Sequence, residues 1–88
     1  MEIGAFARAM QDYCLAFSAS VTSWIRSPDH NARVGGVPTS YHIRGIACDV
    51  VYDGASPGDT ADAMLARRGL QRIREGDHDH IQPFPGTA

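Results

Sequence analysis

The stretch TSYHIRGIACDV, residues 39–50, leads from a loop into a strand and places a histidine and an aspartate close together in sequence. The mostly apolar run IACDVVY predicts a strand over residues 45–52. Asp49 is the one charged residue in that run. An unpaired carboxylate in an apolar strand is costly, so Asp49 needs a cation or several hydrogen-bond donors. His42 precedes the strand and can fold back toward it, because Gly45 relaxes the backbone.

N-terminal to this stretch, the sequence predicts a helix, a strand and a long loop. Apolar residues recur at steps of three and four over residues 2–17, which indicates an amphipathic helix. Alternation over residues 21–25 indicates a short strand. Two prolines and two glycines interrupt residues 26–40, which we expect to be a loop. A loop of this length in so small a chain is typical of a functional or a disordered segment.

C-terminal to the stretch, we expect a second helix and two further strands. Ser56 has the position of a helix cap, and the helix is expected to run to about residue 68 before a glycine ends it. Residues 70–75 and 78–83 then form two strands, joined by a turn at Gly76-Asp77. The tail after them is expected to be irregular.

This order of elements predicts an α+β fold with a small, mostly antiparallel sheet of about four strands and two helices. The chain has 88 residues, so we expect residues 1–88 to form one domain. A chain of this length buries only about 60% of the surface that its unfolded form exposes. A bound metal would therefore add usefully to its stability.

Composition and charge exclude several classes of function. The net charge is −2, so there is no electrostatic case for a nucleic-acid partner. No segment approaches the ~20 apolar residues of a membrane span. The N-terminal MEIGAFARAM shows no secretory signal. Cys14 and Cys48 lack metal-binding spacing and are interpreted as buried thiols.

The polar residues gather around Arg26, around His42 with Asp49, and in the run DHDH at residues 77–80. Zinc accepts imidazole nitrogen and carboxylate oxygen, and a catalytic zinc site uses three protein ligands and leaves one position open. His42, Asp49 and a histidine of the last strand would supply such a set. His78 and His80 share a face of that strand, so spacing does not decide between them.

Each of these signals also has a simpler interpretation. Asp49 could accept hydrogen bonds from backbone amides. The DHDH run could be a solvated edge strand, because charged side chains protect sheet edges. Considered alone, an arginine such as Arg26 is most often a surface residue. The joint occurrence of all three clusters with a Gly-Gly loop favours a functional site.

These residues also resemble a known family. SYHIRGIACD, residues 40–49, matches the S-x-H-x-x-G-x-A-x-D motif of the zinc D-Ala-D-Ala carboxypeptidases. That family includes vancomycin-resistance D,D-dipeptidases and peptidoglycan endopeptidases of phages. TSWIRSP at residues 22–28 and VGG at residues 34–36 look like its upstream segment, and residues 77–80 match its [D/E]-x-x-H element. The resemblance covers residues 4 to 83.

The resemblance implies a Hedgehog- and DD-peptidase-like fold with one zinc ion held by His42, Asp49 and His80. It implies that Asp77 is the general base and that Arg26 faces the carbonyl under attack. Four further residues would hold the ligands or the loop in place or contact the substrate: His78, Ser40, Ser23 and Tyr41.

The function implied is a zinc metallopeptidase that hydrolyses peptide bonds in peptidoglycan stem peptides. D-Ala-D-Ala carboxypeptidase and L-Ala-D-Glu-type endopeptidase activities both remain open. Without a visible signal, we expect a protein made in the cytoplasm that acts at the bacterial cell wall, with phage or prophage delivery. A larger assembly would then supply targeting to the wall.

The alternative is a non-catalytic metal-binding module, as in Hedgehog signalling domains, or a phage structural component that binds cell-wall fragments. Such a module needs neither Asp77 nor Arg26. Because the chain has both, the enzyme is favoured.

Overall fold

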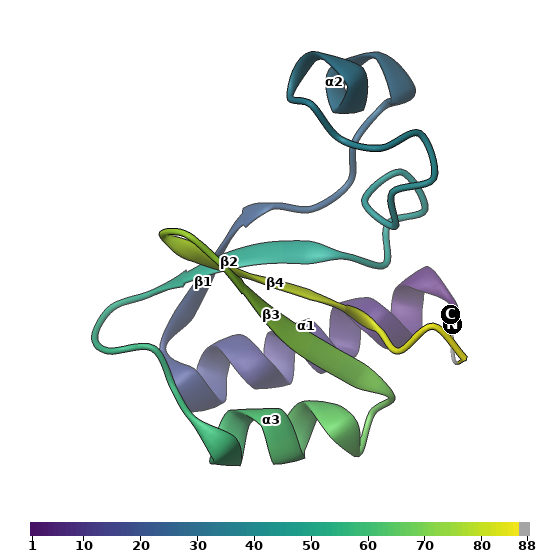
Figure 1. Ribbon diagram of the computed structural model, residues 1–88. Coiled ribbons are helices and arrows are strands. Elements are labelled where there is room, and N and C mark those ends of the chain that lie inside the picture. The colour runs from purple at the N-terminus through teal and green to yellow at the C-terminus, as the bar shows by residue number, and fades with distance from the viewer. Residues whose placement is uncertain (87–88) are drawn as a thin grey trace.

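The computed structural model describes residues 1–86 and contains four strands that form one antiparallel sheet in the order β1-β2-β4-β3 (Figure 1). The elements are α1 (Ile3–Phe17), β1 (Ala19–Ser23), α2 (Pro28–Arg33), β2 (Cys48–Tyr52), α3 (Asp59–Ala66), β3 (Leu70–Glu75) and β4 (His78–Pro83). The predicted α+β class and small antiparallel sheet are confirmed. A third helix, α2, is present where two helices were expected.

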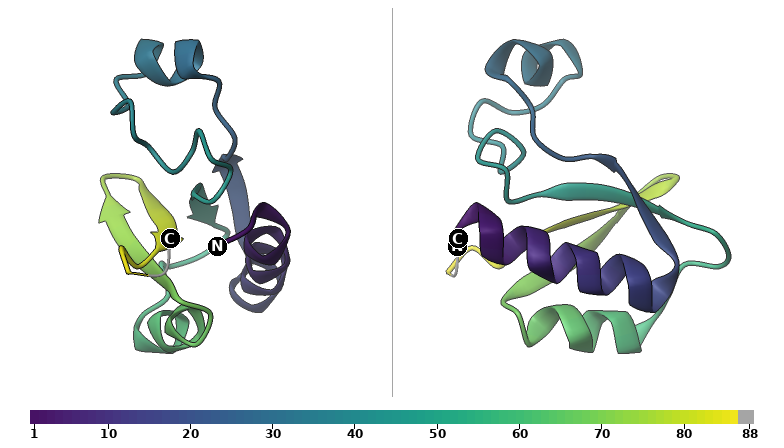
Figure 2. Two further views of the ribbon diagram at one scale, coloured as in Figure 1. Left: turned by 90° about the vertical axis from the view of Figure 1, so that its right-hand side faces the viewer. Right: turned by 180° about the vertical axis from the view of Figure 1, so that it is seen from behind.

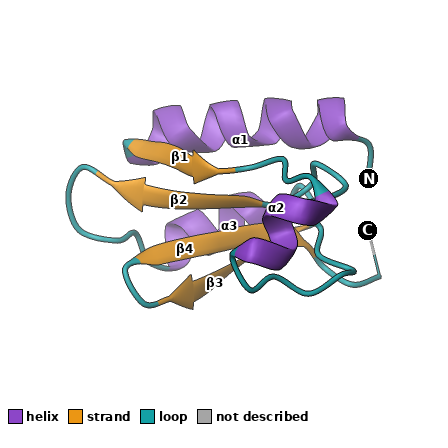
Figure 3. Ribbon diagram, turned by 90° about the horizontal axis from the view of Figure 1, so that it is seen from above, coloured by secondary structure: helices purple, strands orange, loops and turns teal. Residues whose placement is uncertain are grey.

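The two faces of the sheet have different coverings. Helices α1 and α3 pack on one face, whereas α2 and its connecting loops lie on the opposite side (Figures 1, 2 and 3). The buried side chains between the helices and the sheet form the core, and the largest are Tyr13, Phe6, Ile46, Leu65, Leu70 and Ile81. None of the helices among residues 1–86 has the length and apolar character needed to cross a bilayer.

Alternation along the strands separates the core from the polar face. Cys48 pairs with Ile81 and Val50 with Asp79, and all four side chains are buried. Asp49 and His80 form the pair between them, so their side chains point to the opposite face. Asp49 and His80 therefore share the face that α1 and α3 leave uncovered.

The segment predicted as a long loop over residues 26–40 contains the helix α2, so that prediction is wrong. The Oγ of Ser27 accepts a hydrogen bond from the backbone N–H of His30 at 3.1 Å, and Pro28 occupies the first turn. A serine cap followed by proline is a standard helix start. The helix has six residues, too few to show a clear apolar period.

Strand boundaries differ from the prediction at two places. β1 runs over Ala19–Ser23 instead of residues 21–25, with a register shift between Val21 and Ser23. β2 begins at Cys48, because the preceding residues form turns: Gly45 has a φ of +73° and its N–H donates to the carbonyl of His42. The apolar run in the sequence thus begins before the residues that pair with the neighbouring strands.

The cap predicted for the second helix is also wrong. Gly58 is the residue at the start of α3, and no side chain caps this end. The Ser56 hydroxyl instead lies 3.3 Å from Oδ2 of Asp79. The strands predicted at residues 70–75 and 78–83 have the bounds observed for β3 and β4.

The alternative of a solvated edge for the DHDH run is contradicted, because β4 lies between β2 and β3. Asp79 is fully buried on the core face, where the Tyr52 hydroxyl donates to it at 2.7 Å. Arg72 and Arg74 pair with the same carboxylate at 3.0 and 3.3 Å. Burial alone would raise the pKa of Asp79, but these donors outweigh it and the pKa is lowered.

Candidate metal centre

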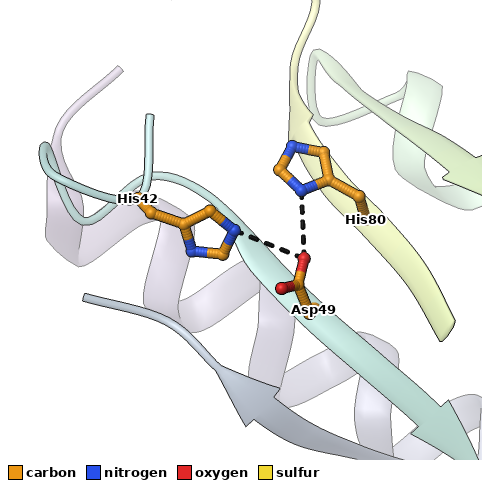
Figure 4. Close-up of side chains that lie close together, drawn as sticks. All are labelled: His42, Asp49 and His80. Atoms are coloured by element: carbon orange, nitrogen blue, oxygen red, sulfur yellow. Dashed lines mark hydrogen bonds and ion pairs between the residues drawn. The ribbon is translucent and has the colours of Figure 1, made fainter. Parts of the chain in front are cut away.

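Three of the predicted site residues meet on the polar face of the sheet (Figure 4). Oδ1 of Asp49 lies 3.0 Å from Nδ1 of His80 and 3.3 Å from Nε2 of His42. Asp49 and His80 come from the adjacent strands β2 and β4, and His42 comes from the turns before β2. The candidate ligand atoms of all three residues lie within 4.8 Å of one another.

His42 is held rigidly by backbone contacts. Its Nδ1 lies 2.6 Å from the carbonyl of Trp24, and its own carbonyl accepts a hydrogen bond from the N–H of Arg26. The Oγ of Ser40 accepts from the His42 N–H at 3.2 Å. The side chain is 2% exposed, and this burial lowers the pKa of His42, which favours the neutral imidazole.

In His42 and His80, the outer ring nitrogen, which points away from Asp49, has an oxygen partner. This partner determines whether the inner nitrogen, which faces Asp49, carries a proton. Nδ1 of His42 donates to the Trp24 carbonyl, and Nε2 of His80 donates at 2.7 Å to the side-chain oxygen of Gln82. In neutral imidazoles with these tautomers, each inner nitrogen carries a lone pair. Two nitrogen lone pairs then face the Asp49 carboxylate oxygen, an arrangement that a cation stabilises.

The spacing of these atoms fits zinc. Zinc lies about 2.0–2.2 Å from imidazole nitrogen and carboxylate oxygen, so two ligands at a tetrahedral angle are ~3.3 Å apart. The observed separations of 3.0 and 3.3 Å from Asp49 Oδ1 agree with that value. The outer hydrogen bonds resemble those that orient histidine ligands in zinc proteins. His42, Asp49 and His80 are thus suited to hold a zinc ion.

Arg26 lies beside the Asp49 carboxylate. Its Nη2 is 3.2 Å from Oδ2 of Asp49, and its Nη1 is 3.2 Å from the side-chain oxygen of Asn31. Asn31 is buried in α2 and donates at 2.7 Å to the carbonyl of Val37. Gly36 approaches the Asn31 amide so closely that a side chain at position 36 would overlap it. Asn31 therefore links the loop at Gly36 and Val37 to the guanidinium of Arg26.

A cavity of about 340 Å³ opens beside the three candidate ligands and is lined by Arg26, Ser40, Glu75 and His78 as well. Glu75 and His78 are partners across the β3–β4 hairpin. Nε2 of His78 lies 3.4 Å from Oε1 of Glu75 and 4.0 Å from Oδ1 of Asp49. Glu75 is not among the residues predicted from the sequence, although a two-residue turn at Gly76-Asp77 already places it opposite His78.

Asp77 does not line this cavity. Its side chain is 99% exposed in the turn, and its Oδ1 lies 3.0 Å from Nδ1 of His78. This hydrogen bond is the main cause that lowers the pKa of Asp77 and the main cause that raises the pKa of His78. Asp77 thus reaches the site through His78, whose other ring nitrogen faces the cavity.

The remaining predicted residues have different positions. Ser40 lines the cavity and supports His42. Tyr41 lines an adjoining cavity of about 420 Å³ that Ser40 and His80 also border. Ser23 pairs with Asp49 across β1 and β2 but is outside the residues that line either cavity.

Comparison with known proteins identifies the family. The family model described as Peptidase M15 matches residues 4–82, which is most of the chain. No curated protein and no solved structure gives a match. The chain therefore belongs to the peptidase M15 family, whose members are zinc-dependent hydrolases that act on peptidoglycan.

Proposed function

We propose that this chain is a zinc-dependent peptidase that hydrolyses a peptide bond in peptidoglycan stem peptides. The observation that carries the proposal is the convergence of two imidazole nitrogens on one carboxylate oxygen, at 3.0 and 3.3 Å. Family membership supports the substrate class. The open cavity beside the cluster gives a substrate access to it.

His42, Asp49 and His80 would hold the zinc ion. When bound, zinc supplies a Lewis acid that polarises a carbonyl and makes water acidic enough to react near neutral pH. Within residues 1–86 this set has three protein ligands, which would leave a position for the reacting groups, as catalytic zinc sites require.

His78 is the residue best placed to accept the proton of the attacking water. Nδ1 of His78 donates to Asp77, so Nε2 of the neutral ring carries a lone pair that faces the cavity. Asp77 then orients His78 and raises its basicity, and the pair together carries the general-base role that the family resemblance implies for Asp77 alone. The same imidazole can return the proton to the leaving amine.

Arg26 is placed to stabilise negative charge that develops on the carbonyl oxygen. Its guanidinium borders the cavity, and contacts with Asn31 and Asp49 fix its orientation before the substrate arrives. A donor held in advance in this way stabilises a transition state without reorganisation.

The substrate would lie across the two adjoining cavities, which share Ser40 and His80. D-Ala-D-Ala carboxypeptidase and L-Ala-D-Glu-type endopeptidase activities are both compatible with this arrangement. We further propose that the protein acts as one domain at the bacterial cell wall, delivered by a phage or prophage, with targeting supplied by a larger assembly.

Digestion of purified muropeptides by the zinc-loaded protein, with mass analysis of the products, tests the proposal and names the bond. We expect cleavage that stops on removal of zinc and returns on its addition. Binding of one zinc equivalent without cleavage of any muropeptide would identify the chain as a non-catalytic metal-binding module instead. Less than ~0.2 zinc equivalents, with no thermal shift at saturating zinc, would refute both functions.

A further inference from the structure

We infer that Glu75, His78 and Asp49 form a second zinc position beside the metal centre, and that zinc bound there inhibits the peptidase. Glu75 and His78 are outside the proposed ligand set of the first ion, and Asp49 belongs to both sets. The inference rests on the proposed function, because it assumes a first ion on His42, Asp49 and His80.

The ligand atoms of the second set have suitable separations. Nε2 of His78 lies 3.4 Å from Oε1 of Glu75, close to the ~3.3 Å expected for two ligands of one tetrahedral zinc ion. Oδ1 of Asp49 lies 4.0 Å from the same nitrogen, and the three ligand atoms are all within 4.8 Å of one another. The 3.4 Å separation fits directly, whereas the 4.0 Å separation between His78 and Asp49 would shorten by about 0.7 Å when an ion binds.

The hydrogen bond behind His78 prepares it as a ligand. Its Nδ1 lies 3.0 Å from Oδ1 of Asp77, which leaves Nε2 directed at Glu75 and Asp49. A carboxylate on the far nitrogen is the arrangement that fixes the tautomer and ring orientation of histidine ligands to zinc. The hairpin register, which pairs Glu75 with His78, holds the two ligands on one face.

Exposure and charge make this position accessible but weaker than the first. The side chains of His78 and Glu75 are 30% and 49% exposed, whereas that of His42 is 2% exposed. Arg26 already pairs with Asp49, and an ion at the first position adds further positive charge nearby. The first position therefore fills before the second.

Zinc at the second position has a defined consequence for activity. It occupies Nε2 of His78, the atom proposed to accept a proton, and it narrows the cavity that the substrate enters. Zinc should then activate the protein at one equivalent and inhibit it in excess.

Calorimetric titration of the zinc-free full chain with zinc, in a buffer that does not bind metals, tests this. We expect a tight event and a separate weaker event in the wild type. Glu75→Gln should lose the weaker event and keep the tight one. The chain has one other glutamate, Glu2, which is exposed at the N-terminal end of α1. Glu2→Gln therefore removes the same charge outside the proposed site and should retain both binding events.

Activity provides a second measurement. Excess zinc should suppress muropeptide cleavage by the wild type and by Glu2→Gln, but not by Glu75→Gln. A single event in the wild type up to saturation, or two events in Glu75→Gln, overturns the second position while leaving the first intact. Absence of the tight event in the wild type overturns the proposed function as well, so the two failures are distinguishable.

Discussion

Asp49 of β2 and His80 of β4 are direct partners across the sheet, and Oδ1 of Asp49 lies 3.0 Å from Nδ1 of His80. The pairing places two of the three candidate ligands on neighbouring rigid strands. Because both strands also contribute side chains to the core, the packing of the whole sheet sets their relative position. The fold therefore largely sets the positions of these two candidate ligands.

Loss of one ligand should abolish zinc binding. His42→Ala removes an imidazole that lies 3.3 Å from Asp49, and the two remaining ligands cannot complete a zinc site. His30→Ala is the matched control, because His30 is exposed on α2 and outside the cavity. Metal analysis of the purified variants should find about one equivalent in the control and none in His42→Ala. Equal zinc contents would contradict the ligand assignment.

Removal of zinc should destabilise the fold. Free zinc at one hundred times its dissociation constant adds about 2.7 kcal/mol to the free energy of unfolding. The thermal midpoint should fall on treatment with a chelator and recover when zinc is restored. An unchanged midpoint in both steps would show that the cluster of His42, Asp49 and His80 does not take up the ion.

Substitutions in the Asp77–His78 pair should separate their roles. His78→Gln should lower kcat by about 10²–10⁴-fold, because it removes the proton acceptor. Asp77→Asn should cost less, about 10–100-fold, because it removes only the group that orients the ring. Both variants should keep the tight zinc equivalent. If Asp77→Asn is the more damaging and His78→Gln remains active, Asp77 is itself the base.

Replacement of Arg26 should slow the reaction without loss of zinc. Arg26→Ala removes a donor beside Asp49 and should lower kcat by about 10²–10³-fold, as expected for loss of one transition-state donor. Arg33 is exposed at the end of α2, so Arg33→Ala is a charge-matched control. Steady-state kinetics on a muropeptide substrate measure the difference. Similar rates for the two variants would remove Arg26 from the mechanism.

The buried carboxylate of Asp79 should contribute to stability and not to catalysis. Asp79→Ala removes the fully buried acceptor of the Tyr52 hydroxyl. Arg72 is partly exposed and keeps its pairing with Asp62, so the loss should be about 1–3 kcal/mol in denaturant unfolding. The variant should still bind zinc, since Asp79 faces the core and not the cavity. A loss below ~1 kcal/mol would show that the network around Tyr52 and Arg72 is not stabilising.

Asp79 also gives a pH dependence of known sign. Its pKa in the folded protein lies below the ordinary value near 3.8, so the unfolded chain binds the proton more readily. The stabilisation is present above that ordinary value and is lost as the pH falls through the folded pKa. Unfolding measured from pH 6 to pH 2 should show this acid-dependent loss in the wild type and less of it in Asp79→Ala.

Local chemistry accounts for what could be predicted without a structure. Apolar residues at helical steps marked α1, and the turn at Gly76-Asp77 between two alternating runs marked β3 and β4 with their observed bounds. Helix period, strand alternation and turn preference depend on neighbouring residues only. The short helix α2 was not predicted, because six residues are too few to show a helical repeat of apolar side chains. The Ser27-Pro28 cap was nevertheless a local signal for its start.

The sequence by itself determined the α+β class, the family resemblance and the candidacy of His42, Asp49 and His80. Only the tertiary structure decided how these residues meet, since Asp49 and His80 are 31 positions apart and become neighbours through the β2–β4 register. The tertiary structure also decided that Asp77 is exposed to solvent and that Glu75 lines the cavity. Register and burial depend on contacts between distant segments, and no local pattern encodes these contacts.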